Sequence, residues 1–175
     1  MDEKELVRLL METSYLEGDF TLRSGRKSHY LIDKYGFETR PELLREVSRR
    51  LADMLPEGVD RLAGVELGGV PLVTAVALQS GLPFVIVKKQ RKGYGSDQLI
   101  EGELESGEHI VLMEDVTTTG GTACKAAETL REAGAGRVSV LTVVDRQEGA
   151  EKTFREADVP YSALFTRESL GIEAD

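Results

Sequence analysis

Two adjacent acids, followed at once by a loop of threonines and glycines, are the part of this 175-residue sequence best suited to chemistry. The stretch HIVLMEDVTTTGGTACKAAETLREAGA, residues 109–135, begins as an apolar strand, turns polar at Glu114 and Asp115, and ends in a helical pattern. Glycines allow successive N–H groups to point inward, and a helix N-terminus adds about half a positive charge. Threonine hydroxyls can donate to the same anion. The pattern predicts a phosphate monoester bound at the start of a helix.

The acids narrow the class of ligand. A Walker loop carries a lysine after its glycines and a dinucleotide-binding loop requires GxGxxG, and this loop has neither. Carboxylates accept hydrogen bonds from vicinal hydroxyls, so the combination favours a sugar phosphate. The alternative is an ordinary strand–loop–helix junction with a threonine N-cap, in which two acids at the end of a buried strand would be costly.

The segments around this loop are expected to form the sheet that positions it. Apolar runs predict strands at 61–65, 83–87, 109–113 and 137–144, with helical patterns between them at 70–80 and 122–133. Continuous apolar strands separated by helices of about 10 to 15 residues are typical of an α/β fold, a parallel sheet covered on both faces. In such sheets ligands bind beyond the carboxyl ends of the strands, which is where the acids fall.

The N-terminal residues do not follow this alternation. Residues 3–16 place Leu6, Leu9, Leu10 and Tyr15 on one helical stripe, residues 20–22 and 30–32 flank Ser24-Gly25 as a hairpin, and Pro41 begins another helix. We expect residues 1–40 to form a small hood subdomain, joined by the C-terminal tail around 159–171. The α/β core is then expected to span about 41–158.

Composition excludes several classes of protein. The chain has 22 Lys and Arg against 31 Asp and Glu, a formal net charge of −9, which argues against nucleic-acid binding through a general basic surface. One cysteine excludes an internal disulfide, and two histidines give no zinc-ligand spacing. No apolar run approaches the roughly 18 residues of a membrane span, and the first residues lack a secretory signal. A soluble, cytoplasmic protein is therefore expected, with neither a nucleic acid nor a membrane as partner.

Two further segments could contact an anion. Gly68-Gly69 in GVELGGVPL (64–72) permits close approach of the backbone, although a plain turn is the alternative. The segment VKKQRKGYGSDQLIEGE (87–103) holds four cations in five residues and is rich in glycine. A charge run of this kind is usually a solvated surface, and only its place after a predicted strand favours a functional loop.

The motif EDVTTTGGT resembles the phosphoribosyl-diphosphate (PRPP) signature of type I phosphoribosyltransferases, and the resemblance in motif order extends over nearly the whole chain. It implies the type I phosphoribosyltransferase fold, with residues 41–158 as the PRPP-binding core. It also implies that Glu114 and Asp115 hold the ribose hydroxyls, with Asp115 among the catalytic residues. The 5′-phosphate is then held by the loop of Val116, Thr117, Thr118, Thr119, Gly120, Gly121 and Thr122.

Two segments resemble the orotate phosphoribosyltransferases in particular. FTLRSGRKSHYLID (20–33) is similar to their N-terminal hairpin, which implies that Arg23 contacts orotate and PRPP; many members have lysine there. VDRQEG (144–149) is similar to the strand end whose arginine binds the orotate carboxylate. Arg146 is then the specificity residue, since a guanidinium matches a planar carboxylate with two parallel hydrogen bonds. Thr118 is also assigned to orotate. The alternative for Arg146 is a surface arginine paired with Glu148.

The basic segment matches the family's mobile loop, which covers the pyrophosphate in the neighbouring subunit's site and assists its departure. Lys89 and Lys92 match the two loop lysines and are the remaining catalytic candidates. Lys88 stands where arginine is common and Tyr94 where histidine is common. A phenol titrates near pH 10, so Tyr94 is unsuited to proton transfer at neutral pH. Gly68 and Gly69 resemble the family's pyrophosphate loop, in which some members carry lysine at position 68.

The reaction implied is orotate plus PRPP giving orotidine 5′-monophosphate and pyrophosphate, a step of UMP biosynthesis. Mg²⁺ is the expected cofactor, held chiefly by the diphosphate and the ribose hydroxyls and without dedicated protein ligands. A homodimer with active sites shared between subunits is expected. Two alternatives remain: a type I phosphoribosyltransferase for a purine or uracil, and a catalytically inactive PRPP-sensing regulator. The second would usually carry a DNA-binding element, for which this acidic chain has no obvious room.

Overall fold

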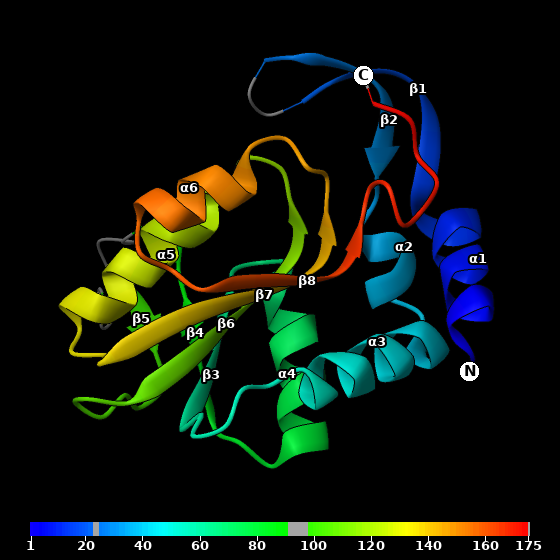
Figure 1. Cartoon of the computed structure of the whole chain (residues 1–175). Helices are drawn as coiled ribbons and strands as arrows, with labels where there is room; N and C mark the ends of the chain where they lie inside the picture. The colour runs from blue at the N-terminus through cyan, green and yellow to red at the C-terminus, as the bar shows by residue number, and fades with distance from the viewer. Residues whose placement is uncertain (23–24, 91–97, 175) are drawn as a thin grey trace.

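The computed structural model describes residues 1–22, 25–90 and 98–174 of the chain. The elements in these ranges form a two-stranded sheet near the N-terminus and a six-stranded sheet. Figure 1 shows the six-stranded sheet between two layers of helices, with the small sheet set over one end. None of the helices in these ranges is long and apolar enough to cross a membrane.

The six-stranded sheet has the strand order β5-β4-β3-β6-β7-β8. Its strands are β3 (Arg61–Val65), β4 (Phe84–Val87), β5 (Ile100–Glu101), β6 (His109–Thr117), β7 (Arg137–Asp145) and β8 (Tyr161–Thr166). All neighbouring strands run parallel except β4 and β5, which pair antiparallel. The expected parallel sheet is confirmed, with one short antiparallel strand at its edge.

Helices cover both faces of this sheet, as the continuous apolar strands predict. Side chains alternate along β6: Val111 and Met113 join the cluster that contains α3 and α4, whereas Ile110 and Leu112 join the cluster that contains α5 and α6. These helices are α3 (Pro41–Asp53), α4 (Gly69–Ser80), α5 (Gly121–Glu132) and α6 (Ala150–Glu156). The sheet is therefore held at its centre by two separate hydrophobic layers.

The hood, residues 1–40, consists of α1 (Glu3–Ser14), β1 (Tyr15–Thr21), β2 (Lys27–Ile32) and α2 (Tyr35–Glu38). The carboxylate of Asp2 caps α1, since its Oδ1 accepts the N–H of Glu5 at 2.9 Å. The helix ends at Ser14, so Tyr15 starts β1 rather than continuing the helical stripe. β1 and β2 pair antiparallel and form the expected hairpin.

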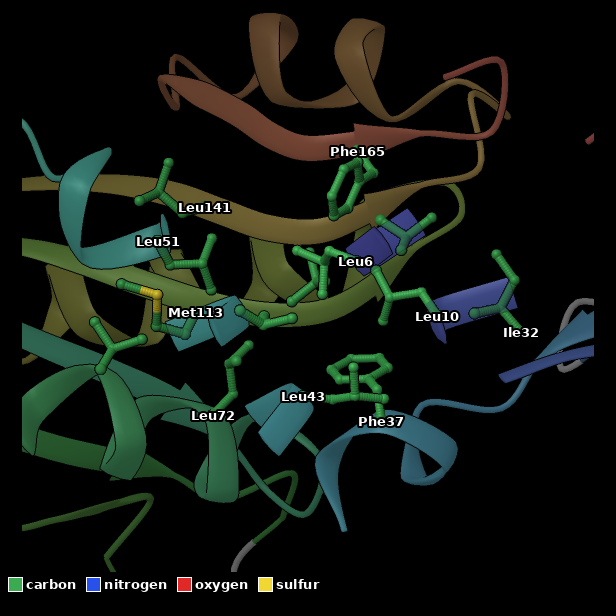
Figure 2. Close-up of a cluster of buried hydrophobic side chains, with 14 of the residues drawn as sticks. Leu6, Leu10, Ile32, Phe37, Leu43, Leu51, Leu72, Met113, Leu141 and Phe165 are labelled. Carbon is green, nitrogen blue, oxygen red and sulfur yellow. The ribbon is translucent and has the colours of Figure 1, made fainter. Parts of the chain in front are cut away.

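The hood shares one hydrophobic cluster with the sheet (Figure 2). Leu6 and Leu10 of α1 and Phe37 of α2 are buried in this cluster. It also contains Leu43 and Leu51 of α3, Leu72 of α4, Met113 of β6, Leu141 of β7 and Phe165 of β8. A single hairpin has little stability of its own in water, so this packing determines where the hood sits.

The C-terminal residues divide between the sheet and the hood. Residues 161–166 form β8, parallel to β7, instead of joining the hood as expected. The reason is that the segment has apolar partners on both faces: Tyr161 stacks on Phe154 at 4.3 Å between ring centroids, and Phe165 is buried in the hood-side cluster. The residues after β8 return to the hood, where Ile172 is buried and the tail runs beside the hairpin (Figure 1).

The strand order reverses between β3 and β6. From β3 the chain moves outward to β4, and it then returns to the other side of β3 to form β6, β7 and β8 in turn. Such a reversal leaves a crevice at the carboxyl ends of the two parallel strands. β6 continues to Thr117 rather than ending at residue 113, so Glu114 and Asp115 lie in the strand at this crevice.

Candidate functional site

A cavity of about 500 Å³ lies at the carboxyl ends of β3 and β6. An unbroken run from Glu114 to Ala123 contributes to its wall. The other described wall residues are Leu22, Lys34, Val65, Glu66, Gly68 and Lys89. The fold therefore brings the acidic pair and the threonine–glycine loop into one cavity with parts of the glycine loop and the basic segment.

The loop presents the N-terminus of α5 to this cavity. Gly120, just before the helix, has φ of 82°, in the left-handed region that favours glycine. A Cβ atom at this position would also lie 3.1 Å from the ring of Phe154. Among the described residues, no side chain caps the first turn of α5. Its first N–H groups are therefore left to an anion in the cavity.

The threonines of the loop differ in what they can offer a ligand. Thr117 is buried, and its hydroxyl donates to Thr142 Oγ1 at 3.1 Å, which ties β6 to β7. Thr118 is half-buried, whereas Thr119 and Thr122 are exposed at the cavity wall. We therefore expect the hydroxyls of Thr118, Thr119 and Thr122, rather than that of Thr117, to reach a bound phosphate.

Asp115 is held through both oxygens of its carboxylate. Oδ1 accepts the N–H of Val116 at 2.6 Å, and Oδ2 accepts Nζ of Lys34 at 2.8 Å. The Asp115 side chain is only 5% exposed, and Lys34 comes from the hood, directly before α2. This ion pair joins the hood to the end of β6 at the cavity wall.

Two further carboxyl groups near this pair hold their protons more tightly than usual. Burial raises the pKa of Glu38 to about 8, the charge of Asp115 adds to the effect, and Lys34 opposes it. Neither carboxyl oxygen of Glu38 has a hydrogen-bond partner within the described ranges. Burial also raises the pKa of Glu114, again reinforced by Asp115. Glu38 is therefore largely protonated near neutral pH, and Glu114 shifts in the same direction.

The loop after β3 contributes Glu66 and Gly68 to the wall. A Cβ atom at Gly68 would overlap Oδ2 of Asp115 and lie 2.6 Å from Nζ of Lys34, so the site has no room for a side chain there. The peptide bond that precedes this turn, Glu66–Leu67, is cis. Gly69 begins α4 and is buried, and it is not among the wall residues.

The basic segment is only partly within the described residues. Oε1 of Glu66 accepts the backbone N–H of Lys89 at 2.8 Å, which fixes Lys89 at the cavity of its own chain. Lys88 is not part of the wall, because its Nζ donates to Glu101 at 2.7 Å. Lys92 and Tyr94 lie outside the described residues, as does Arg23 of the hairpin.

Arg146 is neither a surface residue nor part of the cavity wall. It is 2% exposed, and its guanidinium lies 4.1 Å from the centre of the Tyr30 ring. Its Nε donates to Glu148 at 2.8 Å and its Nη2 to Ser28 at 3.1 Å. The pairing with Glu148 thus exists, but in a buried setting. The Arg146 backbone N–H donates to the carbonyl of Thr117 at 2.9 Å, which places the residue beside the end of β6.

Lys34 and Glu38 are charged or titratable residues at the site that the sequence analysis missed, as is Glu66. The partner of Lys34 lies 81 positions further along the chain, and no local charge pattern separates this lysine from others in the hood. The one feature of the sequence that could have indicated Lys34 is its position directly after segment 20–33, the hairpin expected to contact the substrates. Within the described residues, no group of three or more His, Cys, Asp or Glu side chains is placed to hold a metal ion.

This chain resembles proteins of known family in both sequence and fold. A family profile described as a phosphoribosyl transferase domain matches residues 38–159. An orotate phosphoribosyltransferase of Methanocella arvoryzae is 44% identical over 169 residues, which covers 96% of this chain and 97% of that protein. The crystal structure of orotate phosphoribosyltransferase from Aeropyrum pernix has a TM-score of 0.82 at 30% identity, covering 94% of this chain and 95% of the other. The crystal structure of Mycobacterium tuberculosis H37Rv orotate phosphoribosyltransferase in complex with PRPP has a TM-score of 0.75 at 28% identity, covering 96% of this chain and 98% of the other.

The buried Glu38 predicts a pH-dependent stability. Between its usual pKa of 4.5 and about 8, the folded state holds a proton that the unfolded chain releases, so this residue makes stability fall as pH rises through that window. Glu38→Gln removes this titration. We expect the thermal midpoint of the variant to fall less than that of the wild type between about pH 5 and about pH 9, by on the order of several degrees.

Thermal denaturation followed by circular dichroism across this pH range is the measurement. Glu128→Gln, an exposed glutamate of α5, is the matched control and should follow the wild-type curve. Parallel curves for Glu38→Gln and wild type would show that Glu38 ionises normally in the folded protein.

Proposed function

The chain belongs to the phosphoribosyltransferase family, among its orotate phosphoribosyltransferases, and we propose that it transfers ribose 5-phosphate from PRPP to orotate in the cavity between β3 and β6. One observation carries this proposal: a single run of chain, Glu114 to Ala123, lines the cavity with acids at one end and an uncapped helix N-terminus at the other. Acids that accept from hydroxyls and N–H groups that donate to a phosphate match the two ends of a ribose 5-phosphate.

The residues of this site act by positioning and electrostatics. The start of α5, with Thr118, Thr119 and Thr122, binds the 5′-phosphate and fixes the sugar. Glu114 and Asp115 accept from the ribose hydroxyls, and the carboxylate of Asp115 favours the positive charge that develops on the ring as the bond from C1 to pyrophosphate breaks. N1 of orotate then forms the new bond to C1 from the opposite face. The products are orotidine 5′-monophosphate and pyrophosphate.

Mg²⁺ is proposed to accompany PRPP, and the donor set of the cavity suits it. Mg²⁺ prefers oxygen ligands and keeps waters and substrate oxygens around it. The described side chains offer Glu114, with its Oε2 lacking a partner, and Asp115, but no three-ligand cluster. The ion would thus be held mainly by the diphosphate and ribose hydroxyls, with these two acids nearby. When bound, it neutralises charge on the diphosphate.

The substrate is tested by following the absorbance of orotate in the presence of PRPP and Mg²⁺. We expect orotate to be consumed only when PRPP is present, with pyrophosphate released in equal amount. The same assay with adenine, hypoxanthine and uracil distinguishes the related transferases, and no turnover with any base would favour the PRPP-sensing regulator. The relative from Methanocella arvoryzae, at 44% identity over 96% of this chain, favours orotate.

Arg146 is proposed to bind the carboxylate of orotate. In support, it is positioned by Tyr30, Ser28 and Glu148, and its backbone is bonded to Thr117 at the end of β6. A buried guanidinium with neighbours on two sides is oriented before the substrate arrives, which lowers the entropic cost of binding. Arg23, outside the described residues, is proposed to contact the substrates from the hairpin.

Arg146→Ala should raise the KM for orotate by at least roughly 30-fold, because losing a buried carboxylate contact costs about 2 to 5 kcal/mol. PRPP binding, measured by isothermal titration calorimetry, should be nearly unchanged. Arg155→Ala, an exposed arginine of α6, is the control, and a thermal melt of each variant shows that it folds. Wild-type KM for orotate in folded Arg146→Ala would remove this residue from the substrate site.

The enzyme is proposed to act as a homodimer with shared sites. The resemblance of segment 88–95 to the family's loop supports this, and Lys92 is the proposed cation that crosses to the neighbouring site. Lys89 was expected to cross as well, but it lines the cavity of its own chain together with Asp115. We therefore propose that Lys89 acts within its chain and Lys92 between chains.

Mixing inactive variants tests this division. Chains carrying Lys92→Ala and Asp115→Asn, allowed to exchange subunits, should regain up to about a quarter of wild-type activity, because half of the dimers are mixed and each has one intact site. Lys89→Ala mixed with Asp115→Asn is the control and should regain nothing, since both defects affect the site of one chain. Subunit exchange is first shown by mass spectrometry. If activity then returns in the mixture with Lys89→Ala but not in that with Lys92→Ala, Lys89 acts between chains and Lys92 within its own chain.

A further inference from the structure

Lys34 is a cation at the cavity wall that neither the motif nor the loop resemblance assigns. It comes from the hood, at the residue before α2, and its Nζ lies 2.8 Å from Oδ2 of Asp115. Its side chain is 30% exposed, against 5% for the side chain of Asp115. The ammonium group therefore lies on the open side of the acid and shares the cavity with it.

The surroundings of Gly68 place this ammonium group within the cavity. A Cβ atom at Gly68 would lie 2.6 Å from Nζ and 2.8 Å from Cε of Lys34. The lysine thus passes directly over the backbone of the loop that begins α4. Thr118 to Thr122, which are assigned to the 5′-phosphate, belong instead to the turn that begins α5. Lys34 is accordingly associated with the ribose acid and the glycine loop.

The charge of Lys34 is secure at any ordinary pH. Burial alone would lower the pKa of this lysine, but the hydrogen bond and charge of Asp115 outweigh it, so the pKa is raised above its usual value. An ammonium group has three N–H donors, and Asp115 accepts one. A ligand in the cavity that Lys34 lines can accept another.

We propose that Lys34 is a diphosphate-binding residue, which donates to the C1 diphosphate of PRPP while it remains paired with Asp115. The inference rests on the proposed function, since it assigns the position of one group of that substrate. A diphosphate is the ligand group whose charge best matches a fixed ammonium, and Lys34 and Gly68 both line the cavity that would hold it. The hood then takes part directly in binding the leaving group.

Lys34→Ala tests the proposal through binding, with three ligands at a fixed Mg²⁺ concentration: PRPP, pyrophosphate and ribose 5-phosphate. PRPP and pyrophosphate should bind roughly 10- to 100-fold more weakly, because one charge-assisted hydrogen bond is lost. Ribose 5-phosphate, which lacks the diphosphate, should bind as it does to the wild type. Lys34→Arg keeps a cation and should retain most of the affinity.

The control is Lys152→Ala, an exposed lysine of α6, which should bind all three ligands normally. If Lys34→Ala binds ribose 5-phosphate and pyrophosphate more weakly by the same factor, the lysine acts only through Asp115. If the binding of all three ligands is unchanged, the lysine has no role. Either result overturns the proposal. If Lys34→Ala does not fold, Lys34→Gln replaces it in the same comparison. Failure of the wild type to bind PRPP would instead reject the proposed function.

Discussion

The hydrophobic cluster shared by the hood and the sheet is the constraint on which the site depends. The hood has one hairpin and two helices, too little to form a core of its own, and it buries Leu6, Leu10 and Phe37 against α3, α4 and the sheet. Phe37 lies three residues beyond Lys34, so the packing that holds this ring also sets the place of the ammonium group over Asp115. The ion pair of Lys34 and Asp115 fixes the positions of the two side chains more than it stabilises the fold, because a buried charge pair gains little beyond its desolvation cost.

Charge in the cavity is balanced before any substrate arrives. Asp115 is paired with Lys34, and burial keeps Glu38 largely protonated near neutral pH and moves Glu114 in the same direction. Three ionised acids near the end of β6, two from the strand and one from α2, would repel a polyanionic ligand such as PRPP. Protonation of Glu38 lessens that repulsion, and Glu114, which lines the cavity, can still exchange hydrogen bonds with ribose hydroxyls. The same burial that lowers stability at high pH therefore makes the cavity suitable for an anion.

The sequence predicted those elements that are determined by residues close together in the chain. Strands β3, β4 and β7 and helices α1, α3, α4 and α5 follow from periodicity and from the glycines and prolines at their ends. The extension of β6 to Thr117 was missed because acids rarely continue a buried strand, and β8 was placed with the hood although it pairs with β7, the strand directly before it in the chain. Lys34 and the burial of Arg146 were missed because their partners are distant in the sequence. Their partners, Asp115 and Ser28, lie 81 and 118 positions away.

The phosphate-binding residues were easier to predict from the sequence than the base-binding ones because a phosphate and a base are bound in different ways. A phosphate is recognised by consecutive N–H groups at the start of a helix, so its residues must be contiguous and leave a strong motif. A planar base has no such requirement, and its contacts come from side chains on separate elements. Arg146, the proposed contact to orotate, is one example: it follows β7 and is held by Ser28 of the hairpin and by Glu148. Arg26 of the same hairpin also pairs with Glu148, so the orientation of Arg146 depends on how the hood docks. The proposed specificity for the base therefore depends on the hood–core interface, whereas the proposed site for the 5′-phosphate belongs to one loop.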